Sequence, residues 1–112
     1  MKVAIPVVEG TLCTHYGQCT RFALFDLDMD RRVVLGRQDV PAPEHQPGLF
    51  PSWLAEQGVD VVLAGGMGSK ARDLFADRGI EVIIGVSGDE PEVVVRSFLA
   101  RELAVTTNPC AK

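Results

Sequence analysis

Apolar residues fall in runs of strand length, separated by glycine, proline and charged residues. Residues 3–8 (VAIPVV) form an unbroken apolar run, which is typical of a strand covered on both faces. Residues 22–28 (FALFDLD) and 32–40 (RVVLGRQDV) predict two further strands, joined by a hairpin turn at 28–31. So short a connection requires antiparallel pairing. Residues 9–20 break all periodicity and predict an ordered loop.

The second half of the chain alternates helical and strand patterns. The predicted order is a proline-rich loop at 41–48, a helix at 49–57, a strand at 59–64, a glycine turn at 65–68, a helix at 69–78, a strand at 80–86 and a helix up to about residue 102. Asp89, with Glu92 three residues later, predicts a capping box for this last helix. Two residues disturb the early strands: Pro6 is expected near a strand end or a bulge, and Gly36 weakens its strand or marks a bulge.

These elements predict the order β-β-β-α-β-α-β-α and an α/β fold. Parallel strands need right-handed helical crossovers, so helices are expected on both faces of a mixed five-stranded sheet, giving three α/β/α layers. With 112 residues, 46% of them hydrophobic and 23% charged, the chain suits one globular domain. We expect that domain over residues 1–103 and a polar tail over residues 104–112.

Charge and cysteine content narrow the function. The net charge is −4 and no basic stripe is present, which argues against nucleic-acid binding. The apolar N-terminus is too short to span a membrane and lacks a cleavage pattern, so we expect a cytoplasmic protein. Three cysteines in a reducing compartment favour thiols, metal ligands or redox chemistry over a disulfide framework.

Candidate chemistry gathers in the loops expected at the carboxyl ends of the parallel strands, where α/β sheets bind ligands. Cys13, His15 and Cys19 lie within seven residues and carry the thiolate and imidazole ligands that iron, copper(I) and zinc select. Their spacing matches no zinc-finger or ferredoxin pattern, and two buried inert cysteines beside a hydrogen-bonded histidine are the alternative. His45 in the proline-rich loop is a further candidate ligand, or simply a solvated side chain.

The turn Gly65-Gly66-Met67-Gly68, followed by Ser69 and Lys70, lies between a strand and a helix. Glycines in this position let backbone N–H groups converge on an anion, with help from the helix dipole. The anion is either phosphate or an anionic sulfide cluster. The alternative is a tight turn that needs glycine only for its backbone conformation.

Several motifs together resemble one family. They are the opening MKVAIPV, the triplet His15-Tyr16-Gly17, the FALFDLD strand, the histidine in the loop before the first helix, and the stretches GVDVVLAGGMGSKARDLF and GIEVIIGVSGDEPEVVVRSFL. Over residues 1–103 the chain is similar to the dinitrogenase iron–molybdenum cofactor biosynthesis family, small proteins with a ribonuclease-H-like α/β/α fold. The glycine turn is the most specific of these motifs, and the histidine–aromatic–glycine triplet is second.

The resemblance implies a non-catalytic carrier that holds a metal–sulfur cluster of iron–sulfur, iron–molybdenum or molybdenum–copper type. It implies cluster binding between the loop with His15 and Gly17 and the turn at 65–68, with His15 as a metal contact. From the turn itself we expect the N–H groups of residues 66–69, Ser69 included, to face the sulfides of the cluster. It also implies partners that assemble or accept the cluster. The middle loop has fewer glycines and histidines than is usual for the family, and the cysteines flanking His15 are not a general family feature. Residues 2–8 contain no carboxylate, which excludes a nuclease of this fold.

Two alternatives stay open. Residues 66–71 fit the pattern G-x-G-x-x-A, which predicts a nucleotide-binding protein, although this chain lacks room for the second half of such a fold. Cys13 and Cys19 could instead switch between thiols and a disulfide in a redox-regulated interaction module. For the oligomeric state we expect a monomer or a weak homodimer.

Overall fold

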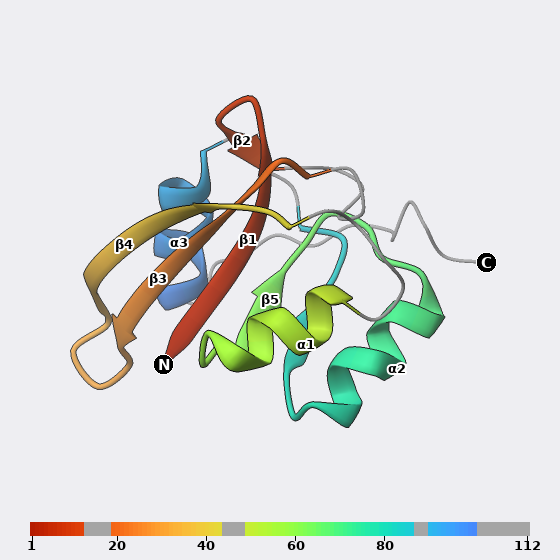
Figure 1. Ribbon diagram of the computed structural model, residues 1–112. Helices are drawn as coiled ribbons and strands as arrows, with labels where there is room; N and C mark the ends of the chain where they lie inside the picture. Colours follow the sequence, from red (N-terminus) through yellow and green to blue (C-terminus); the bar gives the residue numbers. More distant parts are fainter. Residues whose placement is uncertain (13–18, 44–48, 87–89, 101–112) are drawn as a thin grey trace.

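The computed structural model describes residues 1–12, 19–43, 49–86 and 90–100. Its strands are β1 (Lys2–Val8), β2 (Thr11–Leu12), β3 (Arg21–Asp28), β4 (Val33–Pro41), β5 (Val61–Leu63) and β6 (Glu81–Ile83). Its helices are α1 (Leu49–Glu56), α2 (Ser69–Asp77) and α3 (Pro91–Leu99). One mixed sheet has the order β4-β3-β1-β5-β6, and β2 pairs with β1 beside this path (Figure 1). Of the described helices, none is both long and apolar enough to cross a bilayer.

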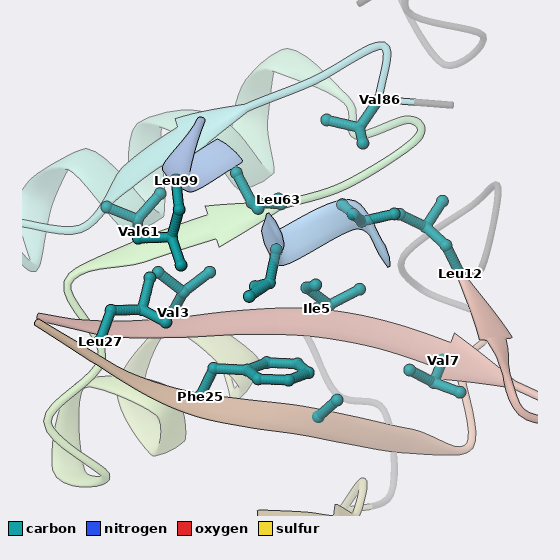
Figure 2. Packing of buried hydrophobic residues seen from close by; sticks show 13 residues of the cluster. Val3, Ile5, Val7, Leu12, Phe25, Leu27, Val61, Leu63, Val86 and Leu99 are labelled. Atoms are coloured by element: carbon teal, nitrogen blue, oxygen red, sulfur yellow. The ribbon is translucent and has the colours of Figure 1, made fainter. Parts of the chain in front are cut away.

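The sheet is covered on both faces, so the α/β fold with helices on two sides is confirmed (Figure 1). On one face, Val94, Val95 and Leu99 of α3 pack on side chains of β1, β3 and β5 (Figure 2). On the other face, Phe50 and Leu54 of α1 and Phe75 of α2 pack on the opposite side chains of the same strands. β1 supplies both cores because alternate residues point to opposite faces, which explains its unbroken apolar run.

β1 is the central strand, and the direction of its backbone hydrogen bonds explains how the chain tolerates Pro6. Met1 and Leu27 exchange two backbone hydrogen bonds, of 3.1 and 2.8 Å, so the backbones of odd-numbered β1 residues face β3. The nitrogen of Pro6 therefore faces the other edge of β1. On that edge β1 pairs with β5 as far as Ala4, and its pairing with β2 starts at Val7. Pro6 lies in the gap between them, so its missing N–H removes no bond to β3.

The prediction of five strands and of a loop over residues 9–20 was wrong in one respect, because the sheet contains β2 as a sixth strand. Glu9 (φ +52°) and Gly10 (φ +82°) form a two-residue hairpin turn in which Val8 pairs with Thr11 and Val7 with Leu12. Positive φ at both central residues is the property of a type I′ turn, which matches the twist of the strands it joins. The turn folds the chain back along β1 immediately before the segment that carries Cys13.

β4 is an edge strand with a bulge at the predicted glycine. Its register against β3 shifts between Val34, which pairs with Leu27, and Gly36, which pairs with Asp26, so that Leu35 is the extra residue. Further along, the guanidinium of Arg37 lies over the Phe25 ring and donates two hydrogen bonds to Asp39, of 2.8 and 3.1 Å. The hydrogen bond to Asp39 is the main cause that raises the pKa of Arg37 above its ordinary value.

The helices begin and end close to their predicted positions. α1 and α2 are followed by Gly58 (φ +81°) and Gly79 (φ +74°), in the left-handed conformation that glycine adopts after a helix. The capping box was wrong: the residue before α3 is Glu90, with no side-chain cap, and Pro91 opens the helix. Asp89 lies outside the described residues. α3 ends at Leu99 with Ala100 as its C-cap, so the predicted end near residue 102 was too late.

Candidate functional site

Five segments of the described chain meet at one edge of the sheet. β1, β5 and β6 are parallel, so the residues after Val8, Leu63 and Ile83 all emerge there. β3 is antiparallel to β1 and begins at this edge, and β4 returns to it at Pro41. Ligands of open α/β sheets bind at such an edge.

The segment at 13–18 lies outside the described residues, but both of its flanks are attached to Val7. On one side Leu12 pairs with Val7 in the β1–β2 hairpin. On the other side the N–H of Thr20 donates to the Val7 carbonyl (2.9 Å), and its hydroxyl donates to the same oxygen (3.4 Å). The Ala42 N–H donates to the Thr20 carbonyl (3.0 Å), which attaches the chain before the segment 44–48 to the same edge.

The turn after β5 is hydrogen-bonded to the turn after β6. The Gly85 N–H donates to the Gly65 carbonyl (2.8 Å) and the Val86 N–H to the Ala64 carbonyl (3.1 Å). In the other direction, the Ala64 N–H donates to the Ile83 carbonyl (2.9 Å). Val86 is buried in the same apolar cluster as Leu12 and Leu63 (Figure 2), so backbone and side chains together hold the two turns beside the end of β2.

This bonding sets the direction of two backbone donors. Consecutive carbonyls of a regular strand point to opposite sides, but those of Ala64 and Gly65 both point toward the turn after β6. A trans peptide is planar, with its N–H opposite its carbonyl, and none of the described peptides is cis. The N–H groups of Gly65 and Gly66 therefore both point away from β6. Within the described part of the chain, neither of them donates to another residue.

The two N–H groups face the side of β5 on which β1 and β2 lie. β5 lies between β1 and β6, so pointing away from β6 means pointing toward β1. Pairing between β1 and β5 has already ended at Ala4 and Val62. The edge of β1 at this height is occupied by β2, whose last residue, Leu12, precedes Cys13. Successive N–H groups aimed to one side form a concavity that binds anions.

The N-terminus of α2 adds further donors. Gly68 is the N-cap in an extended conformation (φ −69°, ψ 157°), and it has no side chain to cap the helix. The first intrahelical bond runs from the Arg72 N–H to the Gly68 carbonyl (3.1 Å), so the N–H groups of residues 69–71 have no acceptor within the helix. The first turn contains no acidic residue, and Lys70 is exposed and forms no ion pair with a described residue. This end of the helix is therefore electropositive.

The predicted site residues differ in their surroundings. Gly65, Gly66 and Met67 are buried, Gly68 is half-buried and Ser69 is exposed. The side chain of Met67 is fully buried in the core on the α1 and α2 face, so only its backbone is available for a role at the edge. Ser69 also borders a cleft of about 400 Å³ between α2 and β6.

Of the predicted metal ligands, only Cys19 is described. It is half-buried and packs against the core on the α1 and α2 face, one residue before Thr20. Cys13, His15, Gly17 and His45 lie outside the described residues. Among the residues that are described, no three His, Cys, Asp or Glu side chains gather as a metal site would require.

The sequence resembles known proteins over most of its length. The profile of the family described as dinitrogenase iron-molybdenum cofactor matches residues 1–101. Among curated proteins, the uncharacterized protein MJ0580 of Methanocaldococcus jannaschii is 24% identical over 85 residues, which cover 73% of this chain and 72% of that protein.

Two solved structures show the same fold. The crystal structure of PH0822 superimposes with a TM-score of 0.87 at 28% identity and covers 94% of each chain. The apo form of the orange protein from Desulfovibrio gigas superimposes with a TM-score of 0.71 at 22% identity, covering 96% of this chain and 94% of that one.

Proposed function

Because the chain belongs to the dinitrogenase iron-molybdenum cofactor family, we propose that it binds an anionic metal–sulfur cluster or its precursor at the carboxyl edge of the sheet. In this proposal the protein is a carrier or scaffold rather than an enzyme, and the cluster is its cargo. It acts in the cytoplasm as a monomer or weak homodimer, with proteins that assemble or accept the cluster as partners. The ribonuclease-H-like label for the fold is part of the same proposal.

The observation that carries the proposal is the pair of N–H groups at Gly65 and Gly66. Hydrogen bonds from Gly85 and Val86 hold the carbonyls of Gly65 and Ala64 on the β6 side, so the N–H groups that follow them face the attachment of the segment 13–18. A sulfide cluster carries negative charge on the surface it presents, and N–H dipoles fixed in advance bind it without reorganisation. The uncapped end of α2 adds donors at Ser69 and a cation at Lys70.

The metal ligands in this proposal come from the segments attached to the same edge. His15 contacts a metal, together with Cys13, Cys19 or both, and His45 is a further candidate. Thiolates and imidazoles suit iron, copper and molybdenum sulfides better than hard cations. The position of Cys19 supports its assignment as a ligand, because it directly precedes Thr20, which is hydrogen-bonded to the carboxyl end of β1.

Anaerobic reconstitution with iron, sulfide and molybdate tests the function. We expect a visible absorption band that remains with the protein on gel filtration, with metal and sulfide in a fixed ratio. Replacing His15 with Ala should lower loading while the thermal unfolding curve is unchanged, because in this proposal the change removes a metal ligand. Equal loading of the wild type and the His15→Ala variant would contradict the assignment of His15, and no loading of the wild type would contradict the function.

A nucleotide is the second candidate ligand, favoured by the observed strand–turn–helix around the Gly66–Ala71 pattern. The N–H groups that would face a sulfide cluster would also suit a phosphate. Thermal stabilisation by NAD, NADP or ATP, with none by iron, sulfide and molybdate, would favour this alternative.

A further inference from the structure

The turn after β6 departs from strand geometry at one residue. In a regular strand, neighbouring N–H groups point to opposite sides, but those of Gly85 and Val86 both donate toward the turn after β5. Gly85 allows both N–H groups to point the same way because its φ is +74°, in the left-handed region that favours glycine. Gly85 is buried, as is Val86, whose side chain is fixed in the core under α3.

We propose that Gly85 is a positioning residue of the site, and this inference rests on the proposed function. Its N–H holds the Gly65 carbonyl at 2.8 Å on the β6 side. The planar peptide between Gly65 and Gly66 is thereby oriented, and the Gly66 N–H is aimed at the cargo. Gly85 itself contacts no cargo, because it lies on the opposite side of the Gly65 peptide.

A side chain at position 85 would break the hydrogen bond that holds the peptide between Gly65 and Gly66. A Cβ disfavours φ +74°, so alanine pulls the backbone toward negative φ and turns the N–H of residue 85 away from Gly65. Without that bond, the peptide between Gly65 and Gly66 can rotate and its N–H is no longer fixed. We therefore expect Gly85→Ala to weaken the binding of an anionic sulfide rather than only to destabilise the fold.

Gly79 offers a control for the backbone conformation, although it is exposed and Gly85 is buried. It has the same φ of +74°, and a Cβ built on it meets no atom within 4 Å. It follows α2 and precedes β6, at the edge of the sheet opposite the site. Gly79→Ala therefore measures the effect of a Cβ at this φ alone, which we expect to be a decrease of several degrees in the melting temperature, on the order of 5 °C.

Titration with tetrathiomolybdate, a coloured molybdenum sulfide anion, compares the three proteins under anaerobic conditions. We expect the wild type and Gly79→Ala to bind with equal affinity, and Gly85→Ala to bind about tenfold more weakly, as the loss of one charge-assisted hydrogen bond implies. Equal binding by Gly85→Ala and Gly79→Ala would overturn the role of Gly85 and leave the proposed function standing. Failure of the wild type to bind would remove both.

Amide hydrogen exchange on the wild type tests the same inference without a variant. The Gly85 N–H should exchange slowly before any ligand is added, since it donates to Gly65. The Gly66 N–H should become protected when tetrathiomolybdate is added. If Gly85 exchanges as fast as an unstructured chain, or if Gly66 stays unprotected in the loaded protein, the inference is overturned whether or not Gly85→Ala folds.

Discussion

Replacing Gly68 with Asp should stabilise the protein and weaken cargo binding at the same time. Gly68 is the N-cap of α2 in an extended conformation, and a Cβ there meets no atom within 4 Å. The aspartate oxygen would accept a hydrogen bond from the N–H of residue 70 or 71, which have no acceptor within the helix. The substitution therefore caps the helix end that we place beside the cluster, and it puts a carboxylate next to the Ser69 N–H that we assign to the cluster.

The gain in stability can be estimated term by term. An Asp cap gains a few tenths of a kcal/mol over Gly, and its charge beside the helix dipole about 0.5 kcal/mol. Restricting the unfolded chain relative to Gly contributes about 0.5 kcal/mol. The sum is about 1 kcal/mol, or roughly 4 °C in melting temperature for a domain of this size.

The loss in binding follows from the same carboxylate. Two like charges about 4 Å apart repel by roughly 1 kcal/mol in water and about 4 kcal/mol near a protein surface, so affinity should fall about tenfold or more. Gly68→Asn is the matched control, because it caps the helix without a charge. Thermal unfolding measures the effect on stability, and tetrathiomolybdate titration at two salt concentrations measures the effect on binding. Higher salt should reduce the difference in affinity between the Asp and Asn variants, because it screens the repulsion.

Equal affinity of the Asp and Asn variants would show that the end of α2 does not face the cargo. A melting temperature that does not rise in either variant would show that Gly68 is not an available cap. These outcomes refute different steps of the reasoning.

The remaining predictions concern the fold. Glu9→Asn should raise the unfolding free energy by about 0.5 kcal/mol in urea denaturation, because Asn adopts positive φ more readily than Glu in the type I′ turn; a lower value would contradict the turn assignment. Phe75→Ala should cost about 3–5 kcal/mol, since this side chain is fully buried between α2 and the sheet. Leu35→Ala is its control, because Leu35 is 65% exposed and its truncation should change stability by less than about 0.5 kcal/mol.

Much of the fold was predictable because local patterns and tertiary packing agree. The run at 3–8 reads as a strand covered on both faces, and β1 does supply both cores. β2 could not be found in this way, since two residues carry no periodicity and Glu-Gly is a weaker turn signal than Asn-Gly. Asp89 was a poor choice of cap because Pro91, which suits a first helical position, directly follows Glu90.

The candidate site was predictable as a location but not as a geometry. The parallel strands place Gly65–Gly68 and the flanks of residues 13–18 at one edge, as topology requires. The orientation of the Gly66 N–H depends on Gly85, about twenty residues away in the chain, through a backbone bond to which no residue pattern points. A glycine directly after an apolar strand was the only local hint.

The hydrogen-bonded turns at Gly65 and Gly85 let the main-chain donors of the site and its side-chain ligands change independently during evolution. The donors they orient belong to the main chain, and every amino acid except proline supplies such a donor. Mutation around them can therefore exchange thiols and imidazoles on the neighbouring segments, and with them the preferred metal, while the receptor for negative charge is passed on intact. If the proposed function holds, a lineage built on this scaffold can change its inorganic cargo without having to evolve a new place to hold it.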